Sequence, residues 1–219
     1  MTARPKEAVG EAYSIDSMRY AQAQTWRAIE ALAARIKPGV SESQARALGK
    51  QVLLELDMER IWHPLLVRIG ANTLKTFGQR SEGDPVLGDD DIYFIDMGAC
   101  WQGHEGDAGA TFTTGNDPQM IACAAAAKTL FEQVQARWQQ GQVTGLELYA
   151  YAEEQAEALG WKLNLNIKGH RVSDFPHSVH KGGDLGDFEA EPGAGLWILE
   201  IQIAHPTEAY GAFYEDLLA

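Results

Sequence analysis

Basic residues are scarce in this sequence. Its 219 residues include 18 lysines and arginines against 31 aspartates and glutamates, for a formal net charge of -13. Nucleic acids and anionic membranes are bound through basic surfaces, so this charge balance argues against both as partners. No apolar run approaches the roughly 20 residues that cross a bilayer, which argues against a transmembrane segment.

Cysteine is also scarce, with Cys100 in an expected strand and Cys123 in an expected alanine-rich helix. The start of the chain, residues 1–7, lacks the apolar core of a signal peptide. We therefore expect a cytoplasmic protein with free thiols. The 45% hydrophobic content is enough for a large core, and no low-complexity linker divides the chain. We expect residues 1–13 to form a polar arm and residues 14–219 to form one domain.

Apolar residues at helical spacing predict four helices, over residues 14–36, 41–58, 118–138 and 146–159. Ser41 and Gln44 have the form of a capping box, and Pro118 stands at an early helical position where its missing N–H is harmless. Residues 62–69 are expected to form a strand and residues 70–88 a polar loop. The order of helix, polar cap, helix and strands occurs twice, which indicates an internal duplication.

Two aspartates interrupt an apolar hairpin in the middle of the chain. Residues 92–95 predict a strand and residues 110–114 its return, with the turn over residues 102–106. A charged carboxylate inside a protein costs several kcal/mol unless something compensates it, and a cation at Asp96 and Asp107 would do so. Taken alone, the stretch is more ordinarily explained by aspartates at hairpin ends that accept backbone N–H bonds.

Further acidic and imidazole residues lie near the C-terminus. His170, His177 and His180 fall within eleven residues, and histidines with nearby carboxylates are typical of a metal site. Glu200 interrupts a strand over residues 195–204 that is otherwise apolar, and few basic residues are available nearby to pair with it. Glu215 lies in a short terminal strand.

These residues, in this order and spacing, resemble the M24-type metallopeptidase superfamily of methionine aminopeptidase, Xaa-Pro aminopeptidase, prolidase and creatinase. The resemblance covers about residues 37–218. It consists of an Asp, a second Asp eleven residues later, a Gly-His loop with another His seven residues on, a Glu after a Pro-Gly turn, and a Glu in the last strand. The matching positions in this chain are Asp96, Asp107, His170, His177, Glu200 and Glu215.

The resemblance implies an α+β pita-bread fold, with two pseudo-symmetric αβ halves around a curved antiparallel sheet. It implies two divalent metal ions held by Asp96, Asp107, His170, Glu200 and Glu215, with His177 and Glu200 acting in catalysis. Four carboxylates and one neutral imidazole balance two divalent ions, and such oxygen-rich ligation suits Mn²⁺ while accepting Co²⁺, Fe²⁺ or Zn²⁺. The implied reaction is hydrolysis of the N-terminal or Xaa-Pro bond of a short peptide.

Two departures from the family pattern concern the residues around the metal ligands. Phe77 stands where the family peptidases have a histidine, and Ala110 stands where an arginine is usual. His63, His104 and His180 are candidates to bind substrate in place of the missing imidazole. Two other hypotheses follow: a pita-bread binding module that has lost peptidase activity, and a hydrolase of a small non-peptide amide. A homodimer is compatible with the sequence.

Overall fold

The structure is a computed structural model that describes residues 6–176 and 183–219. Its α-helices are α1 (Ile15–Ala33), α2 (Glu42–Glu55), α3 (Pro118–Gln139) and α4 (Gly145–Ala158). Its strands are β1 (Arg60–Ile61), β2 (Leu66–Ile69), β3 (Asp91–Trp101), β4 (His104–Thr114), β5 (Lys162–Leu163), β6 (His170–Arg171), β7 (Trp197–Ala204) and β8 (Gly211–Leu217). Short 3₁₀ turns lie at Gly70–Leu74 and Leu185–Asp187.

The helices begin where polar caps precede apolar stripes. Ser41 and Gln44 form a reciprocal capping box at α2, and Thr144 and Glu147 form a second one at α4. Asp117 accepts hydrogen bonds from the first backbone amides of α3, next to Pro118. The predicted helices are therefore confirmed, although α1 and α2 each end three residues earlier than expected.

All strand pairs are antiparallel, in the order β1-β3-β4-β8-β7-β5, with β2 also paired to β3 and β6 also paired to β7. The two long hairpins, β3–β4 and β7–β8, meet in the middle of the sheet through β4 and β8. The β3–β4 turn needs only Gln102 and Gly103, which both have positive φ, instead of the five residues expected. Asp96 and Asp107 therefore lie within the strands, and the interpretation of them as hairpin ends is wrong.

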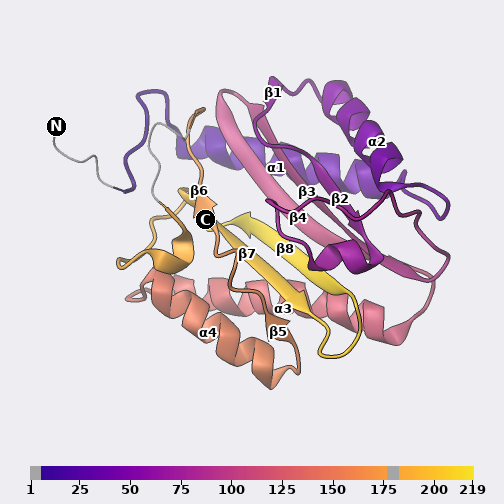
Figure 1. Ribbon diagram of the computed structural model, residues 1–219. Helices are drawn as coiled ribbons and strands as arrows, with labels where there is room; N and C mark the ends of the chain where they lie inside the picture. Colours follow the sequence, from indigo (N-terminus) through magenta and orange to yellow (C-terminus); the bar gives the residue numbers. More distant parts are fainter. Residues whose placement is uncertain (1–5, 177–182) are drawn as a thin grey trace.

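Each hairpin has its own helices and its own hydrophobic core. In Figure 1, α1 lies behind β3 and β4, and α3 lies behind β7 and β8. One core joins α1 and α2 to the first hairpin, with Leu32 and Ile95 fully buried. The other joins α3 and α4 to the second hairpin, with Leu130 and Trp197 fully buried. The two αβ halves confirm the predicted α+β class.

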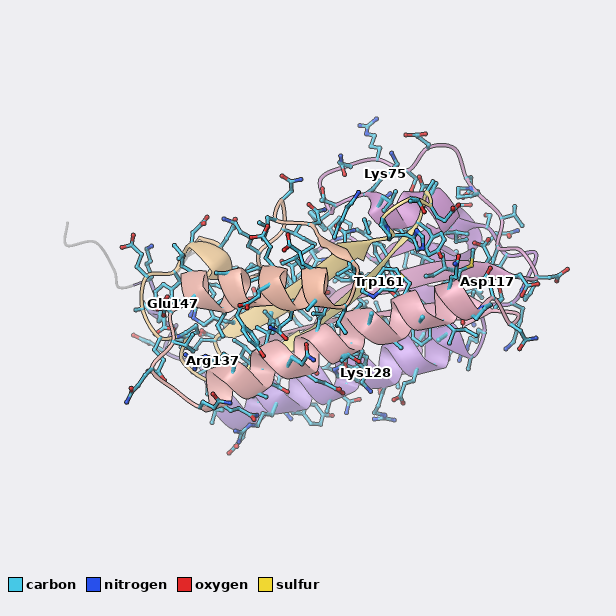
Figure 2. All side chains as sticks on the ribbon, turned by 90° about the horizontal axis from the view of Figure 1, so that it is seen from below. Lys75, Asp117, Lys128, Arg137, Glu147 and Trp161 are labelled. Atoms are coloured by element: carbon cyan, nitrogen blue, oxygen red, sulfur yellow. The ribbon has the colours of Figure 1, made fainter. Side chains whose placement is uncertain are left out.

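The helical layer covers one side of this sheet. Figure 2 looks onto it from below, with α3 running from Asp117 to Arg137 between α4 and α1. Within residues 6–176 and 183–219, no helix is both long enough and apolar enough to cross a membrane. Cys100 and Cys123 are buried free thiols, as expected.

The expected strand over residues 62–69 is wrong in its first half. β1 ends at Ile61 and β2 begins at Leu66, and the chain between them leaves the sheet at Trp62, His63 and Pro64. Pro64 has no N–H with which to continue the ladder, which disfavours a strand there. This excursion carries His63 out over the middle of β3.

Candidate metal centre

A cavity of about 300 Å³ opens where the two hairpins meet. Its walls come from both halves of the chain, and they combine carboxylates and imidazoles with aromatic rings. The lining residues are Trp62, His63, Phe77, Asp96, Asp107, Asn166, Ile167, Lys168, Gly169, His170, Asp184, Glu200 and Glu215. All five predicted metal ligands are therefore brought together at one place.

The sheet register explains how residues far apart in sequence converge here. Asp96 lies opposite Gly109, Gly109 opposite Glu215, and Glu215 opposite Glu200, so one row crosses β3, β4, β8 and β7. Directly opposed residues share a face of the sheet. Gly109 has no side chain in this row, and a Cβ atom there would lie 3.0 Å from Glu215 Oε1. Asp107 lies two positions before Gly109 on β4 and therefore points to the same side of the sheet.

Asp107 lies between two imidazoles. Its Oδ1 is 2.8 Å from His63 Nε2, and its Oδ2 is 3.0 Å from His170 Nε2. His63 Nε2 is also 3.7 Å from Asp96 Oδ1. The side chain of Asp107 is buried, with 1% of the residue exposed. Each carboxylate oxygen of this one residue thus faces a nitrogen from a different half of the chain.

The pKa values of these groups are shifted in opposite directions. Burial, reinforced by the nearby charges of Asp107 and Glu200, raises the pKa of Asp96 to about 7. Burial alone would raise the pKa of Asp107 too, but His63 and His170 outweigh it and lower that pKa to about 2. Burial and the neighbouring carboxylates raise the pKa of Glu215 well above its ordinary value.

The pKa values of Glu200, His63 and His170 show the same balance between burial and charge. Burial raises the pKa of Glu200, and the charge of Asp107 adds to that effect. Burial disfavours charge on the two imidazoles, yet the carboxylates prevail and raise the pKa of His63 to about 9 and that of His170 to about 10. Without a cation, the site therefore holds extra protons to offset its clustered negative charge.

The donor set fits divalent metal ions. Two groups of side chains each bring three ligand atoms within 4.8 Å of one another: His63 with Asp96 and Asp107, and Asp107 with His170 and Glu215. Glu215 Oε1 is buried and accepts no hydrogen bond from any described residue, as expected of an oxygen placed for a cation. Carboxylates and imidazoles are ordinary ligands of Mn²⁺, Co²⁺, Fe²⁺ and Zn²⁺.

The other predicted site residues are placed differently. His63 lines the cavity, whereas His104 does not: its Nε2 accepts a hydrogen bond from the Ser14 N–H at 2.8 Å, and its Nδ1 lies 2.7 Å from the Gln102 carbonyl oxygen. His177 and His180 lie outside the described residues. Phe77 lines the cavity, and its ring meets that of His63 edge to face at 5.6 Å.

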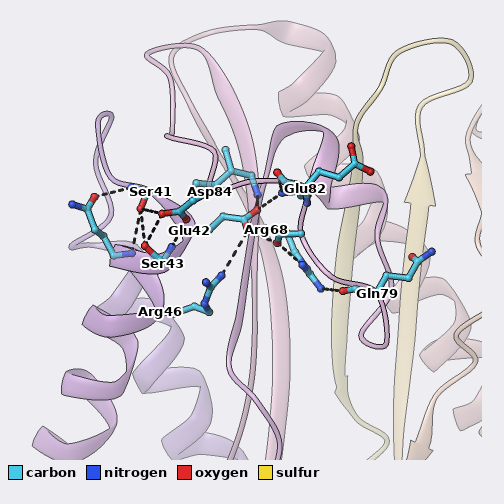
Figure 3. Close-up of polar contacts among 12 residues, drawn as sticks. Ser41, Glu42, Ser43, Arg46, Arg68, Gln79, Glu82 and Asp84 are labelled. Atoms are coloured by element: carbon cyan, nitrogen blue, oxygen red, sulfur yellow. Dashed lines mark hydrogen bonds and ion pairs between the residues drawn. The ribbon is translucent and has the colours of Figure 1, made fainter.

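A buried polar network fixes the loop that carries Phe77. Glu42, at the start of α2, is fully buried and accepts hydrogen bonds from the Ile69 N–H and Asn72 Nδ2, each at 2.9 Å, and from the Ser81 hydroxyl. Arg68 donates to the same hydroxyl and to the Gln79 carbonyl (Figure 3). Both ends of the loop are therefore tied to α2 and β2, which holds Phe77 at the cavity.

Two supporting residues were missed by sequence reasoning. Tyr149 from α4 bonds the backbone of Glu200, and Gly98 on β3 leaves room for the His63 ring. Neither interaction has a local sequence signal. Tyr149 lies among the apolar residues of a helix, and Gly98 lies in a strand where a glycine indicates only a close approach of some kind.

Comparisons with known proteins show the family and the fold of this chain. The sequence model of the family described as "Metallopeptidase family M24" matches residues 16–219. An X-Pro aminopeptidase from Thermotoga maritima MSB8 has a similar structure, with a TM-score of 0.75 at 20% identity over 92% of this chain and 56% of that one. A prolidase from Pyrococcus furiosus is similar with a TM-score of 0.78 at 19% identity, over 97% of this chain and 62% of that one.

A Xaa-Pro dipeptidase from Bacillus anthracis gives a TM-score of 0.77 at 18% identity, over 96% of this chain and 58% of that one. At such identities the likeness shows the fold, and it confirms the predicted pita-bread arrangement. This chain spans about 56% to 62% of the length of these three relatives. A comparison with curated protein sequences gives no match.

Proposed function

This chain belongs to metallopeptidase family M24, and from that premise we propose that it is a metal-dependent peptidase. The proposed reaction is hydrolysis of the N-terminal or Xaa-Pro bond of a short peptide or dipeptide. The observation that carries the proposal is the pair of ligand groups that share Asp107 in one cavity lined by both halves of the chain.

We assign two divalent ions to Asp96, Asp107, His170, Glu200 and Glu215, with Mn²⁺ first and Co²⁺, Fe²⁺ or Zn²⁺ as alternatives. Bound there, such ions would polarise a scissile carbonyl and lower the pKa of a water molecule. A cytoplasmic location, where these metals and reduced thiols coexist, fits the free Cys100 and Cys123.

The protein's own groups supply proton transfer and substrate placement. The Glu200 carboxylate lines the cavity, and we assign to it the transfer of a proton from the attacking water to the leaving amine. Trp62 and Phe77 give the cavity an apolar wall that packs against substrate and excludes water. His177 is assigned to hydrogen-bond the substrate.

A second candidate is a binding module of the same fold without turnover. It is favoured by Phe77, which gives the cavity a ring without a hydrogen-bond donor or acceptor, and by Ala110, which pairs with Ile95 inside the sheet. Such a module would keep the cavity and its ligands for peptides or small amides, because a fold does not by itself determine chemistry.

A substrate panel separates the two candidates. Protein loaded with Mn²⁺ or Co²⁺ is tested on Xaa-Pro dipeptides, Met-peptides, longer proline-containing peptides and small non-peptide amides. We expect turnover of a peptide that a chelator abolishes and that Glu200→Gln lowers at least a hundredfold. Glu132→Gln, the same change on the exposed face of α3, is the matched control and should leave turnover unaltered. Binding without turnover across the panel would favour the module.

A further inference from the structure

His63 is built into the metal centre more firmly than a surface histidine would be. It lies on the excursion between β1 and β2, and its ring occupies the space above Gly98, the residue opposite Asp107. A Cβ atom at Gly98 would collide with this ring, since its three nearest neighbours would all be atoms of the His63 imidazole. Trp62 and Phe77 meet the same ring edge to face, at 4.5 Å and 5.6 Å.

The orientation of this imidazole fixes which nitrogen faces the carboxylates. His63 Nδ1 lies 3.1 Å from the Pro64 carbonyl oxygen, which can only accept, so Nδ1 carries the hydrogen. The lone pair of the neutral ring is then on Nε2, which points toward Asp107 Oδ1 and Asp96 Oδ1. A lone pair opposite two carboxylate oxygens is repulsive unless a proton or a metal ion lies among them.

His170 shows the same arrangement on the other side of Asp107. Its Nδ1 lies 3.0 Å from the Arg171 carbonyl oxygen, and its Nε2 faces Asp107 Oδ2. Metal-binding histidines characteristically donate their second ring N–H to a carbonyl or carboxylate, which fixes the ring and its tautomer. His63 and His170 therefore approach the two oxygens of one carboxylate in equivalent ways.

The separations also fit ligands of a single ion. Ligand atoms about 2.1 Å from one metal ion lie roughly 3 to 3.5 Å from one another. His63 Nε2 is 2.8 Å from Asp107 Oδ1 and 3.7 Å from Asp96 Oδ1, which brackets that range.

We propose that His63 is a further metal ligand, which binds through Nε2 the ion that it shares with Asp96 and Asp107. This inference rests on the metal-dependent function proposed above and adds a sixth side chain to its five ligands. The centre then has one imidazole on each side of Asp107. Because imidazole favours Co²⁺ and Zn²⁺ over Mn²⁺ more than carboxylate does, His63 shifts the metal preference of the site in that direction.

Cobalt(II) provides a direct readout that does not depend on activity. Bound Co²⁺ displaces the NMR signals of ligand imidazole N–H protons far from the diamagnetic region, and these protons disappear in D₂O. Wild-type protein should show shifted, exchangeable signals from both His63 and His170. His63→Gln should lack one of them, and its Co²⁺ affinity should fall at least tenfold, with a smaller fall for Mn²⁺. His205→Gln is the matched control, because His205 accepts bonds from Thr207 and Glu208 outside the cavity.

Gly98→Ala tests the geometry without altering any ligand. The three atoms nearest to the added methyl group all belong to the His63 ring, so the variant should lose the same signal and show a similar fall in Co²⁺ affinity. The double variant should bind Co²⁺ no more weakly than His63→Gln alone, because both changes remove one interaction.

The outcomes separate this inference from the function on which it rests. If wild-type protein binds Co²⁺ and His63→Gln shows the same shifted NMR signals and the same Co²⁺ affinity, the assignment of His63 is overturned. The peptidase proposal would still stand. A Gly98→Ala variant that weakens Co²⁺ binding further in the His63→Gln background would also overturn it. Wild-type protein that binds no Co²⁺ would overturn the metal-dependent function itself, and the role of His63 with it.

Discussion

The hydroxyl of Tyr149 spans the backbone of Glu200, donating to its carbonyl oxygen at 2.8 Å and accepting from its N–H at 3.2 Å. Along this edge β7 pairs with β6 only at residues 197–198 and with β5 only at residues 203–204. Among the residues that the structure describes, Glu200 therefore lies between these two pairings, and a side chain from α4 bonds its backbone there. The same contact fixes the strand segment from which the Glu200 carboxylate reaches the cavity.

Tyr149→Phe should destabilise the fold by about 1 to 3 kcal/mol, because it leaves two backbone groups of a buried strand without their partner. Urea denaturation followed by circular dichroism measures this change. Tyr210→Phe is the matched control, since Tyr210 belongs to the same core and its hydroxyl bonds no described residue. Equal losses in the two variants would contradict the bridging role of Tyr149.

Glu42 should be among the most sensitive residues outside the cavity. Glu42→Ala removes the acceptor of three hydrogen bonds in a fully buried network, and we expect a loss of about 3 kcal/mol in the free energy of unfolding. Protease cleavage within residues 75–84 should become faster, because that loop loses its anchor. Glu55→Gln, which breaks an exposed ion pair with Arg35, should change neither measurement appreciably.

The stability of the metal-free protein should fall as the pH rises from 5 to 9.5. Asp96 has its pKa raised to about 7, so the folded state retains a proton that the unfolded chain loses above about 4. The pKa of His63 is raised to about 9, so this residue contributes stability that is complete below pH ~6.5, the pKa of an unfolded histidine, and is lost as the pH rises through the folded value. The protons of Asp96 and of His63 therefore both make the folded state less stable as the pH rises across this range.

The free energy of unfolding should fall by more than about 1.4 kcal/mol, which corresponds to a shift of one in a single pKa. Denaturant unfolding of chelator-treated protein at several pH values measures this fall. Asp96→Asn should make the decline shallower, because it removes a carboxyl group that gives up its proton within this range. Stability that is level, or that rises, between pH 5 and 9.5 would show that these pKa shifts are absent in solution.

Metal ions bound by Glu200 and the other ligands should offset the loss of stability at higher pH. Mn²⁺ or Co²⁺ should raise the melting temperature at pH 7 to 8 and much less near pH 5, where protons compete for the ligands. Glu200→Gln should leave the metal-free protein at least as stable as wild type, because it removes a carboxylate whose pKa burial raises. It should also reduce the metal-induced gain, and equal gains in the two proteins would exclude Glu200 as a ligand.

The sequence predicts best those features that depend on the type and order of nearby residues. Asp96, Asp107, Glu200 and Glu215 are conspicuous as acidic residues in apolar strands, and His170 belongs to a cluster of histidines. The resemblance to the family predicts these five as ligands, and all five line one cavity. The helices were found because their caps and stripes are local signals. These features can be predicted without knowing how the two halves of the chain pack together.

The supporting residues depend on contacts that span the chain. The sequence offers His63, His104 and His180 as equal candidates to bind substrate. Only the register shows that Gly98 lies opposite Asp107 and leaves room for the His63 ring. Tyr149 reaches Glu200 across 51 residues of sequence. The expected strand over residues 62–69 hid the excursion that delivers His63, because its apolar residues favour a strand more strongly than Pro64 alone disfavours one.

The count of metal ions per chain tests the central claim most directly. Chelator-treated protein is dialysed against Mn²⁺ or Co²⁺ at pH 7.5, and bound metal is measured by elemental analysis in wild type, Asp107→Asn and the control Glu132→Gln. Because Asp107 belongs to both ligand groups, we expect about two ions per chain in wild type and in the control, and fewer than one in Asp107→Asn. Less than one ion per wild-type chain, or binding that Asp107→Asn leaves intact, would contradict the account.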